Sequence, residues 1–91
     1  MIKNFNQLKG RVQELNKLYQ MEGLEFYISG MYGGFKVVIR DSETGEHLEE
    51  LTDGYNSVLE TLEQLEGLKM KDLNWKIEKS YRWYNNDWGV I

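Results

Sequence analysis

The sequence contains no cysteine and no proline. Without cysteine, disulfide bonds and thiolate-ligated zinc sites are excluded. Without proline, the boundaries of helices and strands have to be set by Gly, Asn, Asp and Ser. No apolar run approaches the roughly 18 residues that a membrane-spanning helix needs, and no apolar signal segment follows Met1. We therefore expect a cytoplasmic protein that makes no use of a membrane.

The length and composition are those of one small globular domain. The chain has 91 residues, of which 41% are hydrophobic and 29% charged, so it is neither disordered nor large enough for a second core. We expect residues 1–91 to form a single domain. Its core is expected over residues 4–70, followed by an aromatic C-terminal extension over residues 71–91.

The N-terminal half of the chain predicts one helix followed by strands. Apolar residues three and four positions apart indicate a helix over about residues 4–21, with Asn4 as its N-cap and Gly23 just beyond its end. Alternation of apolar and polar residues then predicts three strands, over residues 24–29, 35–40 and 47–51.

Turn and cap residues complete the predicted fold. The glycine-rich segment Gly30–Gly34 predicts a hairpin loop between the first two strands. Thr52 or Asp53 is expected to cap a second helix, which Gly67 ends. The fold class is therefore α+β, with the helices on one face of a three-stranded antiparallel meander.

The last twenty residues fit two patterns. From Leu73 to Trp83, apolar and polar residues alternate as in a strand, but Leu73, Ile77 and Tyr81 also sit at helical spacing. The β-branched and aromatic content favours a C-terminal strand, with a helix as the alternative.

No residue pattern indicates catalysis. The single histidine, His47, is expected to face solvent in a short edge strand, and no serine follows a G-x-S-x-G pattern. The loop Gly30–Gly34 joins strands and opens no helix, so it does not predict a phosphate site. The segment Asp41–Glu46 lacks the spacing of a calcium loop and predicts an acidic turn. We expect no enzyme activity, no cofactor and no metal.

The carboxylates are concentrated in one part of the chain. Residues 41–66 contain nine acidic residues and no Lys or Arg, a net charge of −9, whereas the remainder has six acids and eleven bases, a net charge of +5. One interpretation is a solvated surface that the basic C-terminal stretch neutralises. The other is an acidic protein-binding face that mimics nucleic acid, made by Glu46, Glu49, Glu50, Asp53, Glu60, Glu63 and Glu66.

Aromatic residues crowd the C-terminal stretch and give a possible second interface. These are Trp75, Tyr81, Trp83, Tyr84 and Trp88, interleaved with Lys and Arg. Core packing is the simplest explanation. A self-association surface and a stacking platform for single-stranded nucleic acid are the alternatives. Direct nucleic-acid binding is disfavoured by the net charge of −4.

Three segments resemble a group of small phage and prophage proteins. They are the helix end Leu15–Gly23, the hairpin Tyr32–Phe35 and the second-helix segment Tyr55–Leu68. Most members of this group have no known function, so the resemblance implies a source more than an activity. Phages also encode small, acidic, cysteine-free inhibitors, anti-CRISPR proteins among them, and the 41–66 segment is similar in kind to their carboxylate-rich faces.

The sequence therefore predicts a non-enzymatic, phage-type inhibitor that binds a bacterial protein through its acidic face. A nucleic-acid-binding defence effector is the expected kind of partner. The alternatives are a self-associating scaffold protein that uses the aromatic C-terminus, and a single-stranded nucleic-acid binder that uses the same stretch.

Overall fold

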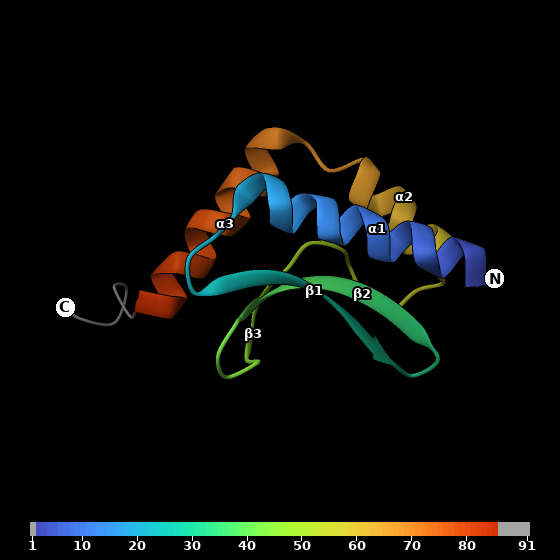
Figure 1. The fold of residues 1–91 in the computed structure, drawn as a ribbon, viewed down its shortest axis with the longest axis horizontal. Coiled ribbons are helices and arrows are strands. Elements are labelled where there is room, and N and C mark those ends of the chain that lie inside the picture. Colours follow the sequence, from blue (N-terminus) through green and yellow to red (C-terminus); the bar gives the residue numbers. More distant parts are fainter. Residues whose placement is uncertain (1, 86–91) are drawn as a thin grey trace.

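The computed structural model describes the backbone of residues 2–85 and the side chains of residues 5–82. Helix α1 (Ile2–Tyr19) is followed by a meander of three strands and then by two helices (Figure 1). The remaining elements are β1 (Leu24–Met31), β2 (Gly34–Asp41), β3 (His47–Glu50), α2 (Val58–Glu66) and α3 (Met70–Asn85). The predicted α+β class is confirmed.

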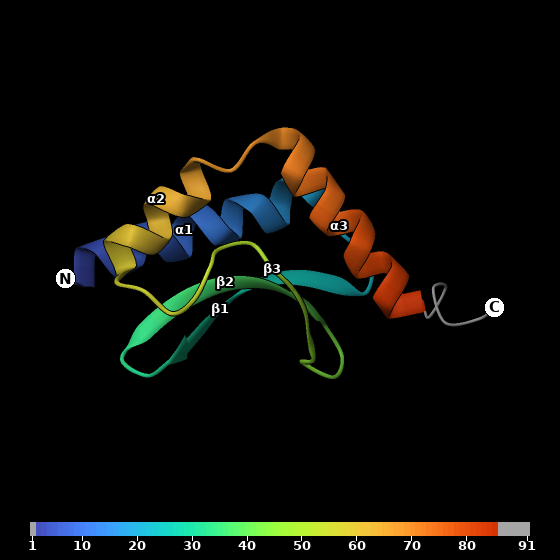
Figure 2. The ribbon, with the colours of Figure 1, turned by 180° about the vertical axis from the view of Figure 1, so that it is seen from behind.

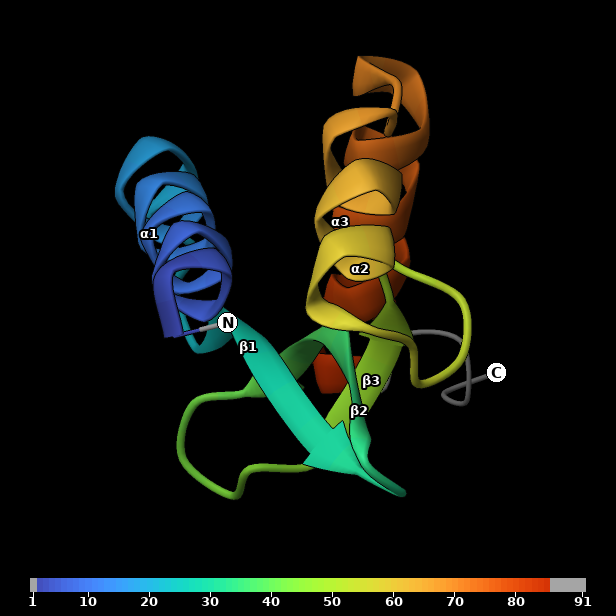
Figure 3. The same cartoon turned by 90° about the vertical axis from the view of Figure 1, so that its right-hand side faces the viewer.

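All three helices cover the same face of the sheet. The strands are ordered β1-β2-β3 and are antiparallel. Figure 1 and the reverse view in Figure 2 show the helices in one layer above the strands. Seen from the side in Figure 3, α1 lies over the β1 side of the sheet, and α2 and α3 lie over the other side. The sheet therefore has one covered face and one open face.

The turn between β1 and β2 is tighter than predicted. Strand pairing continues to Met31 and Gly34, so only Tyr32 and Gly33 remain in the loop. Both have positive φ, 56° and 74°, as a two-residue type I′ hairpin requires. The predicted five-residue loop is wrong because three of its residues belong to the strands.

The chain after β3 continues to pair with β2 on its way to α2. Leu51 N donates to Val37 O at 2.8 Å, and Val37 N donates to the buried Thr52 Oγ1 at 3.0 Å. Phe35 and Asn56 exchange two backbone hydrogen bonds of 2.8 and 2.9 Å. This segment occupies the side of β2 that the short β3 leaves open.

The ends of the first two helices differ from their predicted positions. Helix α1 begins before Asn4 and ends at Tyr19, and Gln20 (φ 40°) takes the left-handed position expected further along the chain. Helix α2 is capped by Ser57, whose side chain accepts a hydrogen bond from Glu60 N at 3.2 Å. The prediction of Thr52 or Asp53 as the cap is wrong because Thr52 is engaged with β2.

The C-terminal stretch is a helix, so the preferred strand interpretation is wrong and the helical alternative is correct. Leu73 is buried on α3, and Ile77 and Tyr81, four and eight residues later, pack against the core. Ser80 is fully buried and donates to Lys76 O at 2.9 Å, the intrahelical bond that satisfies a buried hydroxyl. Leu73, Ile77 and Tyr81 fit both the alternation of a strand and the spacing of a helix. The packing of this stretch onto β3 stabilises the helix.

The core lies between the helices and the covered face of the sheet. Its buried members come from every helix, from β1 and β2, and from the segment after β3. The presence of Leu73 shows that the core extends past residue 70. The buried members are Leu8, Val12, Leu15, Leu24, Phe26, Val37, Ile39, Leu51, Leu65 and Leu73.

Candidate functional site

The structure divides the predicted acidic face into two groups. Glu46, Glu49 and Glu50 lie at or before β3, whereas Glu60, Glu63 and Glu66 lie on α2. Asp53 is exposed in the connecting loop, where its backbone N donates to Gln64 Oε1 at 2.8 Å. The seven carboxylates therefore lie within one stretch of the sequence but do not form one uniform surface.

The β3 carboxylates are largely neutralised within the chain. Glu49 faces α3 and lies 3.7 Å from Lys79 Nζ. Glu50 faces the open side of the sheet, where it pairs with Lys36, and its backbone O accepts a hydrogen bond from Lys76 Nζ at 2.7 Å. The hydrogen bond to Glu50 raises the pKa of Lys36 above its usual 10.5, against the opposing effect of desolvation. Within this group, only Glu49 pairs with the described part of the basic C-terminal stretch. The carboxylate of Glu50 is neutralised by Lys36 of β2, and Glu46 has no ion pair among the described residues.

The α2 carboxylates are exposed and have no ion pair among the described residues. We call Glu60, Glu63 and Glu66 the α2 ridge. Thr61 and Leu65 are buried on the opposite side of the helix, so the ridge faces solvent. Leu59 lies beside the ridge and is 55% exposed. The ridge is the part of the predicted face that keeps its charge and adjoins an exposed apolar side chain.

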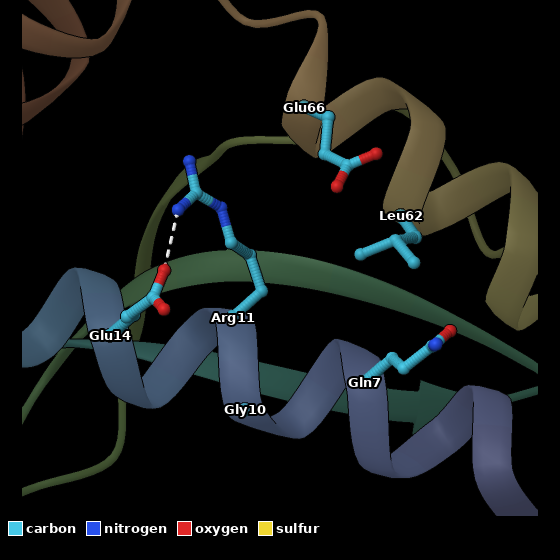
Figure 4. A pocket seen from close by; sticks show the side chains of 6 residues that line it. All are labelled: Gln7, Gly10, Arg11, Glu14, Leu62 and Glu66. Carbon is cyan, nitrogen blue, oxygen red and sulfur yellow. Dashed lines mark hydrogen bonds and ion pairs between the residues drawn. The ribbon is translucent and has the colours of Figure 1, made fainter.

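A shallow hollow lies between α1 and α2, and Glu66 is the residue of the α2 ridge that lines it (Figure 4). Its walls come from α1 and α2, and Arg11 and Glu66 lie on facing sides of it. Arg11 Nη1 donates to Glu14 at 2.7 Å, and Arg11 Nε is buried without a hydrogen-bond partner. Gly10 contributes no side chain, which leaves this part of the α1 surface low. The full lining is Gln7, Gly10, Arg11, Glu14, Leu62 and Glu66.

The two described members of the predicted aromatic interface, Trp75 and Tyr81, do not share one surface. Trp75 is 51% exposed, and the Arg82 guanidinium lies 5.4 Å from its ring centre. Tyr81 instead packs against the core, and its hydroxyl accepts a hydrogen bond from Glu22 N at 3.0 Å. Trp83 and Tyr84 belong to α3, but their side chains lie outside the described part, as does Trp88 entirely.

The open face of the sheet carries tyrosines that the sequence reasoning did not single out. The Arg40 guanidinium lies 3.5 Å from the ring centre of Tyr27 and also pairs with Glu25 at 2.6 Å. Near the hairpin, the rings of Tyr32 and Tyr55 are 5.6 Å apart, and Tyr32 is 87% exposed. The signal in the sequence was the placement of Tyr27 at an outward position of an alternating strand.

Two local predictions near the sheet are confirmed. His47 is exposed at the start of β3, with its ring 6.2 Å from that of Tyr27. The segment after β2 is an ordinary acidic turn, in which Asp41 Oδ1 accepts hydrogen bonds from Glu43 N at 2.8 Å and Thr44 N at 3.2 Å. Asp41 is thus used in the turn itself, as is typical of Asx turns.

Among the residues that the structure describes, no group of three or more His, Asp or Glu side chains is arranged to hold a metal ion. Within the same residues, no helix has the length and apolar character to cross a membrane. The described surface offers the charge of the α2 ridge and a tyrosine-bearing sheet face as recognition features.

Comparisons of the chain with protein-family models, with curated proteins and with solved structures give no match. The resemblance to small phage and prophage proteins therefore stays a prediction.

Proposed function

We propose that the chain is a non-catalytic inhibitor of the phage type that docks the α2 ridge onto a basic surface of a bacterial protein. One observation carries the proposal. The carboxylates of Glu60, Glu63 and Glu66 are exposed and free of ion pairs among the described residues, whereas Glu49 and Glu50 are paired with lysines of the same chain. The ridge is thus the row of carboxylates on one helix that is left available to a partner.

The α2 ridge is unfavourable for the helix that carries it. Like charges three residues apart on a helix repel each other by a few tenths of a kcal/mol per pair. Glu63 and Glu66 also lie near the C-terminal end of α2, where the helix dipole favours cations, and the last turn contains no basic residue. A binding role explains why carboxylates occupy positions that local stability disfavours.

The expected partner is a nucleic-acid-handling defence effector, because its binding groove is basic. A row of carboxylates on a small rigid helix would occupy such a groove in place of phosphates. Long-range attraction between the two surfaces would speed association and would weaken as salt screens it. Leu59, exposed beside the ridge, supplies an apolar contact that salt does not screen.

The test compares two variants with the same change in net charge. In the first, Glu60→Gln, Glu63→Gln and Glu66→Gln neutralise the ridge without changing side-chain length. In the control, Glu22→Gln, Glu43→Gln and Glu78→Gln neutralise three exposed carboxylates outside α2 and outside the predicted acidic face. Each immobilised protein is used to capture partners from bacterial lysate, and the dissociation constant of the captured protein is then measured at low and high salt.

We expect wild type and control to capture the same basic protein, and the ridge variant to lose it. We also expect the salt dependence of binding to be flatter for the ridge variant. Equal capture by the ridge variant, or equal loss by the control, would contradict a role for the α2 ridge. Circular dichroism shows whether both variants keep their helices.

A further inference from the structure

Strand β1 has one hydrogen-bonding edge turned away from the sheet. The two-residue turn makes Met31 and Gly34 a hydrogen-bonded pair. Odd-numbered residues of β1 therefore bond to β2, and even-numbered residues direct their backbone N–H and C=O groups outward. The hydrogen bonds of Asn16 to Phe26 N and O, from outside the sheet, agree with this alternation.

The outward groups are protected over only part of β1. The side-chain amide of Asn16 satisfies both backbone groups of Phe26, at 2.8 and 3.0 Å. No hydrogen bond from the described residues reaches the outward groups of Ile28 or Gly30. An edge with free donors and acceptors in regular alternation is a template for another strand.

The opposite edge of the sheet is protected in a different way. Strand β3 has only four residues and contains a register shift opposite Ile39 and Arg40. Lys76 of α3 also donates to Glu50 O. Short strands, irregular register and nearby lysines are the devices that prevent edge pairing. The β1 edge beyond Phe26 is longer and regular in register. One lysine, Lys9 of α1, lines a hollow beside Ile28, but it makes no hydrogen bond to the strand.

We propose that a second copy of this chain pairs with the free part of the β1 edge, antiparallel and about a two-fold axis at Ser29. Ile28 of one copy then faces Gly30 of its partner, and Gly30 faces Ile28, so four backbone hydrogen bonds form from groups that are free in each copy. A register centred on Ile28 would instead need Phe26, which Asn16 already occupies. Asn16 therefore selects the register.

The side chains of this segment are self-complementary in that register. On the open face, Tyr27 of one copy faces Met31 of the other, and these side chains are 36% and 51% exposed. A methionine sulfur beside an aromatic ring is a favourable contact. The segment from Tyr27 to Met31 contains no charged residue, so the pairing opposes no like charges. These features favour a second copy over an unrelated strand as the occupant.

The pairing is expected to be weak. Two short strand segments bury less than the roughly 1,200–2,000 Å² of a stable interface, so dimers should form only at micromolar or higher concentration. The interface is separate from the α2 ridge, so neutralising Glu60, Glu63 and Glu66 should leave it unchanged.

Sedimentation of wild type, Gly30→Pro and Gly30→Ala over roughly 10 µM to 1 mM tests the proposal. Proline removes the outward N–H of Gly30 and leaves the β1–β2 hydrogen bonds intact. Alanine keeps the N–H, and its Cβ would meet the Phe35 ring at an ordinary 3.5 Å. We expect wild type and Gly30→Ala to dimerise with rising concentration, and Gly30→Pro to dimerise at least tenfold more weakly. A monomeric wild type, or equal dimerisation of a folded Gly30→Pro, overturns the proposal.

Amide hydrogen exchange of the wild type gives an independent check that needs no variant. The N–H groups of Ile28 and Gly30 should exchange more slowly at high than at low protein concentration, whereas that of Tyr27, already bonded to β2, should not change. Concentration-independent exchange at Ile28 and Gly30 overturns the proposal even if the proline variant fails to fold.

Discussion

Asn16 on α1 pairs with Phe26 on β1 as a neighbouring strand would. Its Nδ2 donates to Phe26 O at 3.0 Å, and its Oδ1 accepts from Phe26 N at 2.8 Å. The amide side chain thus carries both a donor and an acceptor to one residue of the sheet edge. The two hydrogen bonds hold α1 against β1 and satisfy the outward backbone groups of one edge residue, Phe26.

Replacing Asn16 with alanine should destabilise the fold and lengthen the free edge. Both groups of Phe26 would lose their partner, at a cost of about 1–3 kcal/mol in the free energy of unfolding. Urea unfolding at low protein concentration measures the loss. Gln13→Ala is the matched control, because Gln13 is exposed on the same helix and surface changes usually stay within about 0.5 kcal/mol. Equal effects of the two changes would contradict the strand-like role of Asn16.

Two glycine-to-alanine changes should shift stability in opposite directions. A Cβ at Gly34 would lie 2.9 Å from the backbone carbon of Tyr55 and 3.0 Å from Asn56 N. The loop and β2 would have to separate, at a cost of about 1–3 kcal/mol. A Cβ at Gly10 meets nothing within 4 Å, so alanine there should add up to about 1 kcal/mol through helix propensity. Thermal unfolding of both variants checks the opposite signs.

The Lys36–Glu50 pair should make stability fall at high pH. Its hydrogen bond raises the pKa of Lys36 in the folded protein above the usual 10.5. The charged pair therefore contributes fully below pH 10.5, and its contribution is lost as the pH rises through the raised pKa. We expect the difference in unfolding free energy between wild type and Lys36→Met to stay constant up to about pH 10 and to shrink above it. A constant difference at all pH values would contradict this coupling.

The sequence predicted the order of elements because most of them carry one clear period. The stripe from Leu8 to Leu15 and the alternating strands around Phe26 and Ile39 each match one template. The strand prediction for the C-terminal stretch was wrong because Leu73, Ile77 and Tyr81 fit both the period of a strand and that of a helix. The N-cap of α2 was predicted at the wrong residue because the Thr52 side chain bonds to Val37, fifteen residues earlier. A contact between residues so far apart leaves no pattern in the local sequence.

The candidate site was predictable as a list of charges but not as a surface. The carboxylates of Glu49 and Glu50 and those of the α2 ridge look alike in the sequence. Within the described part of the chain, only Glu49 and Glu50 of these form ion pairs, with Lys79 and Lys36. These pairs depend on how α3 and β2 pack against β3, which the sequence does not show. The length of the turn also determines which backbone groups of β1 point away from the sheet. Because the turn was predicted too long, the free β1 edge could not be predicted.

The two-residue turn at Tyr32 and Gly33 also bears on the order in which the chain folds. Each strand pairs with its neighbour in sequence, so forming the sheet closes only short loops, at a small entropic cost. A hairpin of this kind forms in about 1–10 µs, before α1 has a strand edge for Asn16 to cap. We therefore expect folding to begin at this turn. Gly33→Ala, which is strained at φ 74°, should then slow refolding more than it speeds unfolding, as stopped-flow kinetics would show.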